Sequence, residues 1–254
     1  MTKAVPSALS AFFAAHPRLA LAFSGGADSA YLLYAATACG CDVKAYYVQS
    51  AFQPAFERED ARRLASELGA RVQFIPLDAL GDDTVGANPA DRCYHCKRRV
   101  FAAILQAAKA DGYDTVIDGT NASDDAGDRP GMRALEELRV LSPLRLCGIT
   151  KAQLREYSRQ AGLFTWDKPA YACLATRVPT GTPLSEALLQ RIEGAEDRLF
   201  DLGFTDFRCR VYHDAARLQF RRDQLERALT LRDAIRAALK PYFDVILLDT
   251  EVRG

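Results

Sequence analysis

Residues 18–29, RLALAFSGGADS, constrain the fold of this chain more than any other segment. A short and mostly apolar run ends at two adjacent glycines, and a sequence that favours a helix follows at once. Such an uninterrupted apolar run is typical of a parallel strand that is buried on both faces. A buried strand, a glycine turn and a helix together predict the first unit of a doubly wound α/β sheet.

The same alternation continues through the first half of the chain. It predicts a doubly wound parallel sheet, in which ligands bind outside the carboxyl ends of the strands. The loops after residues 23, 48 and 118 are therefore expected at one edge. Further strands are expected at 42–48, 71–77 and 115–118, and helices at 28–38, 54–68 and 94–109.

The pattern changes near the Pro/Thr/Gly-rich stretch 178–183, which predicts a domain boundary. We expect an α/β domain at 1–178 that carries the glycine loop and a smaller α+β domain at 179–254, which would bind substrate or form oligomers. In the second domain helices are expected at 185–202 and 224–239, a hairpin at 206–211 and 216–220, and a last strand at 243–248.

Composition narrows the class of protein. No apolar run approaches the roughly 20 residues that a membrane span needs. Residues 1–17 do not resemble a secretory signal and are expected to form a short amphipathic helix, so we expect a cytoplasmic protein. The 33 basic and 33 acidic residues give zero net charge, which argues against a nucleic-acid partner. Seven cysteines in such a chain are not expected to form a disulfide framework.

The glycine loop predicts phosphate binding. Gly25 and Gly26 would let the backbone approach an anion, and the following helix would present N–H groups at its N-terminus. Ser24 and Ser29 add hydroxyl donors. A tight turn without a ligand also uses glycines, but the full SGGADS string in this context favours a site. The loop lacks the GK[ST] of a Walker loop, so transfer of the γ-phosphate is not expected.

SGGADS resembles the PP-loop of the ATP-pyrophosphatase family, whose members cleave ATP between the α and β phosphates and join AMP to a substrate oxygen. This resemblance implies that ATP is a substrate. It also implies that Asp28 acts in catalysis and in nucleotide binding.

A second polar cluster, DGTNASDDAGDRPG, follows the strand expected at 115–118. This composition is typical of a solvated turn and also of a nucleotide-binding loop, and its place at the carboxyl edge of the predicted sheet favours nucleotide binding. We expect Gly119, Thr120 and Asp125 to bind the nucleotide or its Mg²⁺, and Arg129 to neutralise phosphate charge. Ser50, in the loop after the second strand, is expected at the same place.

Three cysteines are candidates for one metal site. Cys93 and Cys96 form a CxxC pair at the start of an expected helix, and Cys173 lies in the loop YACLATRVPTG. The CxxC pair alone would also suit a redox dithiol, or a structural zinc site with Cys147 as a fourth ligand. The remaining cysteines are expected to be packing residues, and they are Cys39, Cys41 and Cys209.

Taken together, SGGADS, DGTN, CLATRVPTG and FRCRVYH resemble the LarE family over nearly the whole chain. LarE proteins are sulfur transferases of nickel-pincer nucleotide synthesis. The resemblance implies that ATP adenylylates a carboxylate of a pyridinium dicarboxylate mononucleotide. Sulfur then displaces AMP and leaves a thiocarboxylate. In one form of the family the cysteine matching Cys173 gives up its own sulfur.

Cys93 and Cys96 set this chain apart from that sacrificial form. With Cys173 they would supply three ligands of a [4Fe–4S] cluster, whose fourth iron would carry an added sulfide. The resemblance therefore implies ATP, Mg²⁺ and a [4Fe–4S] cluster as cofactors. It also suggests a homo-oligomer.

Further substrate residues are carried over from the family by position. Arg177, Arg208 and Arg210 match residues that contact the substrate, and Arg177 is also expected to act in catalysis. Glu196 matches an acidic residue near the substrate. Gln219 stands where the family has a further acidic residue, which leaves a metal or proton role there in doubt. Arginines on a solvated edge strand, or a surface ion pair at Glu196, are the structural alternatives.

Three other functions remain open at the level of sequence. A tRNA thiolase would also combine a PP-loop with cysteines, although zero net charge argues against it. Amide ligation with ammonia, as in NAD synthetase, would give the three cysteines no role. A nucleotide sensor without catalysis would not need the arginines of the C-terminal part.

Overall fold

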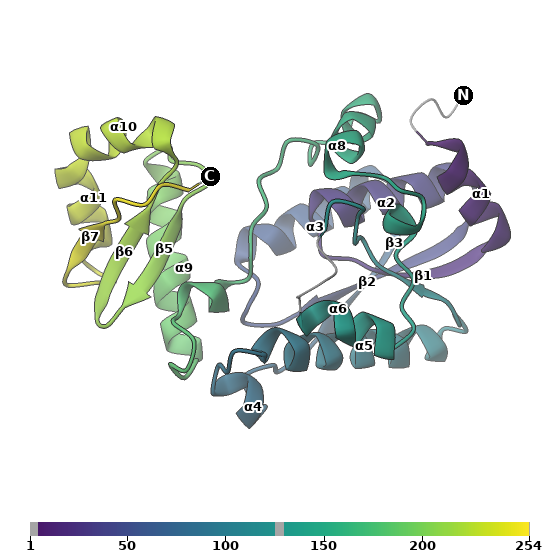
Figure 1. Cartoon of the computed structure of the whole chain (residues 1–254), viewed down its shortest axis with the longest axis horizontal. Helices are drawn as coiled ribbons and strands as arrows, with labels where there is room; N and C mark the ends of the chain where they lie inside the picture. Colours follow the sequence, from purple (N-terminus) through teal and green to yellow (C-terminus); the bar gives the residue numbers. More distant parts are fainter. Residues whose placement is uncertain (1–4, 125–129, 254) are drawn as a thin grey trace. The chain divides into compact units, whose positions relative to one another are not determined.

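The protein is described here by a computed structural model that covers residues 5–124 and 130–253. These residues form two compact units, which are coloured along the chain in Figure 1. The second unit takes two short segments from within the sequence of the first. Unit 1 comprises Met1–Ser50, Ala55–Asp78 and Asp91–Lys168, and unit 2 comprises Ala51–Pro54, Ala79–Ala90 and Pro169–Gly254.

Unit 1 is built on a parallel four-stranded sheet in the order β3-β2-β1-β4. The sheet confirms the predicted doubly wound α/β class, because helices cover both of its faces (Figure 1). Its strands are β1 (Arg18–Ala22), β2 (Asp42–Gln49), β3 (Arg71–Pro76) and β4 (Val116–Ile117).

Two separate apolar clusters lie on the two faces of this sheet. One joins the sheet to α1, α2, α3, α7 and α8, and the other joins it to α5 and α6. The helices are α1 (Ser7–Ala15), α2 (Ala27–Ala38), α3 (Ala55–Glu67), α5 (Arg92–Ala110), α6 (Pro130–Glu137), α7 (Pro143–Leu146) and α8 (Lys151–Gln160).

Strand β1 shows why its sequence is apolar throughout. Leu19 and Leu21 pack into the first cluster, whereas Ala20 packs into the second. Successive side chains of a strand point to opposite faces, so a strand between two helical layers needs apolar residues at every position. The glycine loop that follows is therefore anchored by a strand buried on both sides.

Unit 2 is a small α+β unit with a three-stranded sheet in the order β5-β6-β7. Strands β5 and β6 form the expected antiparallel hairpin, and β7 pairs parallel to β6. The elements of this unit are α4 (Asp83–Gly86), η1 (Leu174–Arg177), α9 (Glu186–Asp201), β5 (Arg208–Tyr212), β6 (Ala215–Gln219), η2 (Arg222–Gln224), α10 (Leu225–Thr230), α11 (Arg232–Leu239) and β7 (Ile246–Leu248).

The single helix predicted at 224–239 is wrong, because the structure divides it into α10 and α11. The break falls at Leu231, whose backbone leaves the helical region with φ −92° and ψ 14°. The Thr230 hydroxyl donates to the Glu226 carbonyl at 3.0 Å. A side chain that bonds the carbonyl four residues back favours a bend in a helix. The last strand is also shorter than the predicted 243–248.

Asn88 ties segment Ala79–Ala90 to the rest of unit 2. Its side-chain amide donates to the carbonyls of Pro179 at 2.9 Å and Thr182 at 3.2 Å, and its own carbonyl accepts from Gly181 at 2.8 Å. The residue is buried and has φ 54°, a left-handed conformation that asparagine tolerates better than most residues. The loop that precedes α5 is thereby held to the loop that follows η1.

Among the described residues, no helix combines the length and the apolar character needed to cross a membrane.

Candidate functional site

The glycine loop of unit 1 leaves the N-terminus of α2 open. Gly25 has φ 74°, and a Cβ on it would lie 3.2 Å from Ala61 Cβ and 3.3 Å from the Glu57 carbonyl oxygen, so a glycine is required. Gly26 caps α2 with extended backbone angles and without a side-chain hydrogen bond to the helix. The first N–H groups of α2 are thus available to an anion, whose charge the helix dipole also favours.

The two serines of the loop bond to each other and to the loop backbone. Ser29 Oγ accepts from the Ser24 N–H at 3.2 Å and donates to the Gly26 carbonyl at 3.2 Å. The two hydroxyl oxygens are 3.1 Å apart. Both side chains therefore shape the loop, and their predicted role in binding a nucleotide stays a prediction.

Asp28, in the first turn of α2, joins three segments of unit 1. Its carboxylate forms an ion pair with Lys151 of α8 and accepts from Asn121 Nδ2 at 3.0 Å. Lys151 was missed by the sequence interpretation. Thr150 and Gln153 form a capping box that starts α8, so Lys151 is the first residue of this helix. A positively charged side chain at the N-terminus of a helix is unfavourable, because it lies at the positive end of the helix dipole. This unfavourable position is the sequence signal that would have identified Lys151 as a candidate functional residue.

The loop after β4 packs directly on the start of α2. A Cβ on Gly119 would lie 2.9 Å from the Ser29 backbone nitrogen and 3.2 Å from Asp28 Cβ. Asp118 is buried and accepts from Ser142 Oγ at 2.6 Å and from Thr120 Oγ1 at 2.5 Å. The predicted neighbours Gly119 and Thr120 are therefore brought to the glycine loop, although the Thr120 hydroxyl is engaged by Asp118.

Three further residues were predicted to bind the nucleotide, and they are Ser50, Asp125 and Arg129. Ser50 is buried just after β2, at the carboxyl edge of the sheet. Asp125 and Arg129 lie outside the described residues.

Replacing Gly119 by alanine is expected to lower the free energy of unfolding by about 1–3 kcal/mol, because the new methyl group meets fixed backbone of α2. Chemical denaturation followed by circular dichroism measures this change. Gly26→Ala is the matched control, since the nearest atom to its Cβ would be Ser24 Oγ at an ordinary 3.4 Å. A Gly119→Ala protein as stable as Gly26→Ala would contradict the close approach.

In unit 2, Cys173 is the N-cap residue of the short helix η1. Its carbonyl oxygen accepts from the Thr176 N–H at 2.9 Å and from the Thr176 hydroxyl at 2.8 Å. The Leu174 N–H donates to the Phe52 carbonyl at 2.9 Å. The backbone around the half-buried Cys173 thiol is therefore fixed on both sides.

Arg177 and Glu196 form a buried, two-pronged ion pair, with at most 1% of either side chain exposed. Arg177 Nε donates to Glu196 Oε1 at 3.0 Å and its Nη2 donates to Oε2 at 3.1 Å. Its Nη1 donates to the Ala172 carbonyl at 2.6 Å, beside Cys173. Burial lowers the pKa of Arg177, but the Glu196 charge raises it above its ordinary value. This pair holds the loop that carries Cys173.

Glu196 also accepts from the Cys209 N–H at 2.9 Å and from the Tyr171 hydroxyl. Burial and then the Glu196 charge raise the pKa of Tyr171, so its hydroxyl stays protonated. The guanidinium of Arg177 lies 4.4 Å from the centre of the Tyr171 ring. Both Arg177 and Glu196 are thus saturated by contacts within unit 2, and their predicted contacts with substrate stay predictions.

Arg208 and Arg210 alternate on β5 and belong to a crowded set of guanidinium groups. Arg208 donates to the Ala170 carbonyl at 2.7 Å, and Arg210 donates to the Thr176 carbonyl at 2.9 Å. Burial, and then repulsion from Arg177 and Arg253, lower the pKa of Arg208 to about 10. Burial and neighbouring arginines also lower the pKa of Arg210. A bound anion would relieve this repulsion.

Gln219 contacts the same group, because its side-chain oxygen accepts from Arg210 Nε at 3.1 Å.

Cys93 and Cys96 occupy the first turn of α5 in unit 1, and Cys173 belongs to unit 2. Residues three apart lie on the same side of a helix, so the first two thiols share a face. Arg92 Nη2 donates to Cys93 Sγ at 3.5 Å. Convergence of the three cysteines stays a prediction. None of the cysteines forms a disulfide, and all of them lie within the described part of the chain.

The other cysteines are packing residues, as expected for Cys39, Cys41 and Cys209. Cys209 is fully buried, and Cys39, Cys41 and Cys147 pack against the larger core of unit 1. Burial raises the pKa of Cys147, which disfavours the thiolate that zinc would need.

The chain is similar in sequence to several known proteins. The chain is 32% identical over 235 residues to the pyridinium-3,5-bisthiocarboxylic acid mononucleotide synthase of Lactiplantibacillus plantarum. The aligned region covers 91% of this chain and 85% of that protein. It is 34% identical over 216 residues to an uncharacterised protein of Synechocystis, covering 85% and 81%. The tRNA-specific 2-thiouridylase MnmA of Frankia alni is 29% identical over 187 residues, covering 60% and 53%. No protein-family model matches the chain.

The parallel sheet, the glycine loop that opens α2 and these relatives define a PP-loop protein of the sulfurtransferase class. Within that class, the chain belongs to the family of pyridinium-3,5-bisthiocarboxylic acid mononucleotide synthases, the LarE family.

Proposed function

We propose that this protein is an ATP-dependent sulfurtransferase that converts a carboxylate of a pyridinium dicarboxylate mononucleotide into a thiocarboxylate. The observation that carries the proposal is the open N-terminus of α2, flanked by the Asp28–Lys151 ion pair. This arrangement suits the binding of a polyphosphate. The pyridinium dicarboxylate mononucleotide is proposed as the acceptor of sulfur because of the relationship to the thiocarboxylic acid synthase of L. plantarum.

Two displacements make up the proposed reaction. A carboxylate oxygen of the substrate attacks the α-phosphorus of ATP, and the bond to the β-phosphate breaks, so that pyrophosphate leaves. Hydrosulfide (HS⁻) or its equivalent then attacks the carbonyl carbon of the acyl adenylate. AMP leaves with the former carboxylate oxygen, one proton is released, and no net oxidation or reduction occurs.

In unit 1, the residues around α2 would bind the ATP. The N–H groups of α2 would hold phosphate oxygens, and Lys151 would neutralise charge that develops on the departing pyrophosphate. The Asp28 carboxylate offers the oxygen ligands that Mg²⁺ prefers. Its present hydrogen bond from Asn121 fixes its orientation.

In unit 2, two pairs of residues would have different tasks. Arg208 and Arg210 would bind the phosphate of the mononucleotide, since an anion offsets the repulsion that lowers their pKa values. Arg177 and Glu196 are satisfied by each other, so they would act by holding the Cys173 loop in place.

The cysteines suit a [4Fe–4S] cluster by the chemistry of their donors. Cys93 and Cys96 present two thiols on one face of α5, and Cys173 would supply the third ligand. Such a cluster, when bound, would supply an iron without a protein ligand that can bind sulfide. Asn88 would help by holding the segment before α5 against the loop after η1.

Protein purified without oxygen is expected to be brown and to contain iron and acid-labile sulfide. Cys93→Ala, Cys96→Ala and Cys173→Ala should each lose most of both, because each removes one of three ligands. Absorption spectra with iron and sulfide analysis measure this, and Cys147→Ala is the matched control. Colourless protein with stoichiometric zinc would contradict the cluster. Dehydroalanine at Cys173 after turnover would instead support the sacrificial mechanism.

The proposed activity is tested with ATP, sulfide and the dicarboxylate mononucleotide. Pyrophosphate, AMP and thiocarboxylate should form in equal amounts, and mass spectrometry should show one oxygen exchanged for sulfur. The relationship to MnmA favours tRNA thiolation as the second candidate. Binding of tRNA that weakens steeply with salt, together with sulfur transfer to it, would replace the first proposal with the second.

A further inference from the structure

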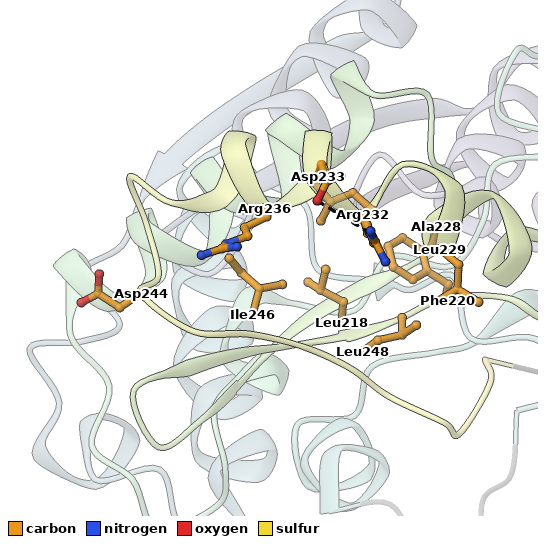
Figure 2. A pocket seen from close by; sticks show the side chains of 11 residues that line it. Leu218, Phe220, Ala228, Leu229, Arg232, Asp233, Arg236, Asp244, Ile246 and Leu248 are labelled. Carbon is orange, nitrogen blue, oxygen red and sulfur yellow. Dashed lines mark ion pairs between the residues drawn. The ribbon is translucent and has the colours of Figure 1, made fainter.

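The three-stranded sheet of unit 2 has two chemically different faces, because side chains alternate between the faces along each strand. The inner face is apolar, and Leu218 and Ile246 line a groove there beside α10 and α11 (Figure 2). We call the opposite face, which is mostly polar, the outer face. On β5 and β6 it comprises Arg208, Arg210, Tyr212, Ala215, Arg217 and Gln219.

The outer face opens toward the far end of β5. Arg208, at the start of the strand, is only 5% exposed, whereas Tyr212 at its end is 49% exposed. Arg208 and Arg210 donate to carbonyls of the segment that carries Cys173. Tyr212 lies two residues beyond Arg210 on the same face, about 7 Å further along the strand. A phosphate at the two arginines would therefore leave the ring of a mononucleotide near Tyr212.

Two neighbours contact the Tyr212 ring, and both leave much of it in water. The His213 ring lies in a T-shaped arrangement with it, with the ring centres 4.8 Å apart. The guanidinium carbon of Arg217 lies 6.0 Å from the centre of the Tyr212 ring, which is the outer limit of a cation–π contact. The ring therefore suits a flat cationic partner that can approach it more closely than Arg217 does.

Arg217 is the cross-strand partner of Arg210, so two like charges are neighbours on the outer face. Burial, Arg177 and then Arg217 lower the pKa of Arg210. The counter-charge of Arg217 is Asp249, whose Oδ2 lies 3.3 Å from Arg217 Nε. Neither of these two atoms has a hydrogen-bond partner among the described residues, and the Arg217 side chain is 41% exposed. A carboxylate from solvent can therefore bind Arg217 and reduce the repulsion.

We propose that Tyr212 and Arg217 recognise the pyridinium ring of the substrate, an inference that rests on the proposed function. The ring would stack on Tyr212, because a positively charged ring is attracted to the electron-rich face of a tyrosine. Arg217 would pair with the ring carboxylate that is not being converted. With the phosphate at Arg208 and Arg210, these contacts would fix the mononucleotide along the outer face. Neither Tyr212 nor Arg217 would touch the reacting atoms, so both would determine affinity and specificity.

Binding of nicotinic acid mononucleotide tests the stacking, because this probe combines a phosphate, a pyridinium ring and one carboxylate. Calorimetry with α,β-methylene-ATP present to fill the nucleotide site should show about 3–30-fold weaker binding to Tyr212→Leu than to the wild type. Tyr212→Phe keeps the ring and should recover most of the affinity. Ribose 5-phosphate lacks the ring and should bind all three proteins alike. Equal binding of the mononucleotide to the wild type and Tyr212→Leu, no binding to the wild type, or a matching loss for ribose 5-phosphate would overturn the stacking.

Nicotinamide mononucleotide, in which a neutral amide replaces the carboxylate, tests the role of Arg217. Arg217→Gln should weaken the binding of nicotinic acid mononucleotide by about 10-fold and the binding of the amide much less. Arg198→Gln, at an exposed arginine of α9, is the matched control and should bind both probes as the wild type does. Equal losses for the two probes on Arg217→Gln, or no loss for either, would overturn the contact. The proposed function fails separately, if the wild type binds these probes and forms no thiocarboxylate from the dicarboxylate mononucleotide.

Discussion

Replacing Glu196 by alanine is expected to lower the free energy of unfolding of unit 2 by about 3–5 kcal/mol, since it leaves the Arg177 charge buried without a partner. The Cys209 N–H and the Tyr171 hydroxyl would also lose their acceptor. Denaturant unfolding monitored on unit 2 would measure the change. Asp201→Ala is the matched control on the same helix, because Asp201 has an exposed ion pair with Arg198 and should cost less than about 1 kcal/mol.

A double replacement separates the charge from the packing. Glu196→Leu combined with Arg177→Met removes both charges while it keeps much of the volume. It should recover a large part of the stability, since a buried ion pair often gives little net stabilisation over apolar residues. If the free energy of unfolding of Glu196→Ala lay within about 1 kcal/mol of the wild-type value, water would reach Arg177 in the variant. The inference that the Arg177–Glu196 pair holds the Cys173 loop rigidly would then be wrong.

The fold of unit 1 was predictable because each signal is local. Apolar runs gave the buried strands, and the glycines of SGGADS marked the turn into α2. Lys151 shows the limit of such reasoning, because its contact with Asp28 joins residues that are 123 positions apart. The conflict with the helix dipole was visible in the sequence, but the partner was not.

Unit 2 was less predictable for the same physical reason. Its hairpin and α9 follow local patterns, whereas two of its segments come from Ala51–Pro54 and Ala79–Ala90. The anchor of the second segment, Asn88, gives no periodic signal, since its effect depends on carbonyls more than 90 residues away. Glu196 was predicted as a residue near the substrate, and its burial against Arg177 depends on tertiary packing.

Replacing Lys151 by methionine is expected to slow the release of pyrophosphate by about 10²–10³-fold, if the proposed chemistry holds. Methionine keeps the length and the packing of the side chain while it removes the charge beside α2. Phosphate release after added pyrophosphatase would follow the reaction. Lys240→Met is the control, because Lys240 is an exposed lysine of unit 2 and should leave the rate unchanged.

The partner of Lys151 distinguishes a catalytic role from a structural one. If the charges of Lys151 and Asp28 served only to stabilise each other, and neither residue acted on ATP or on Mg²⁺, then Asp28→Asn would restore much of the rate in a Lys151→Met background. If Lys151 acts on the pyrophosphate, the double variant should be no faster than Lys151→Met alone, because the departing charge still lacks its cation. Recovery of the rate in the double variant would therefore assign the ion pair to the fold of the loop, and not to catalysis.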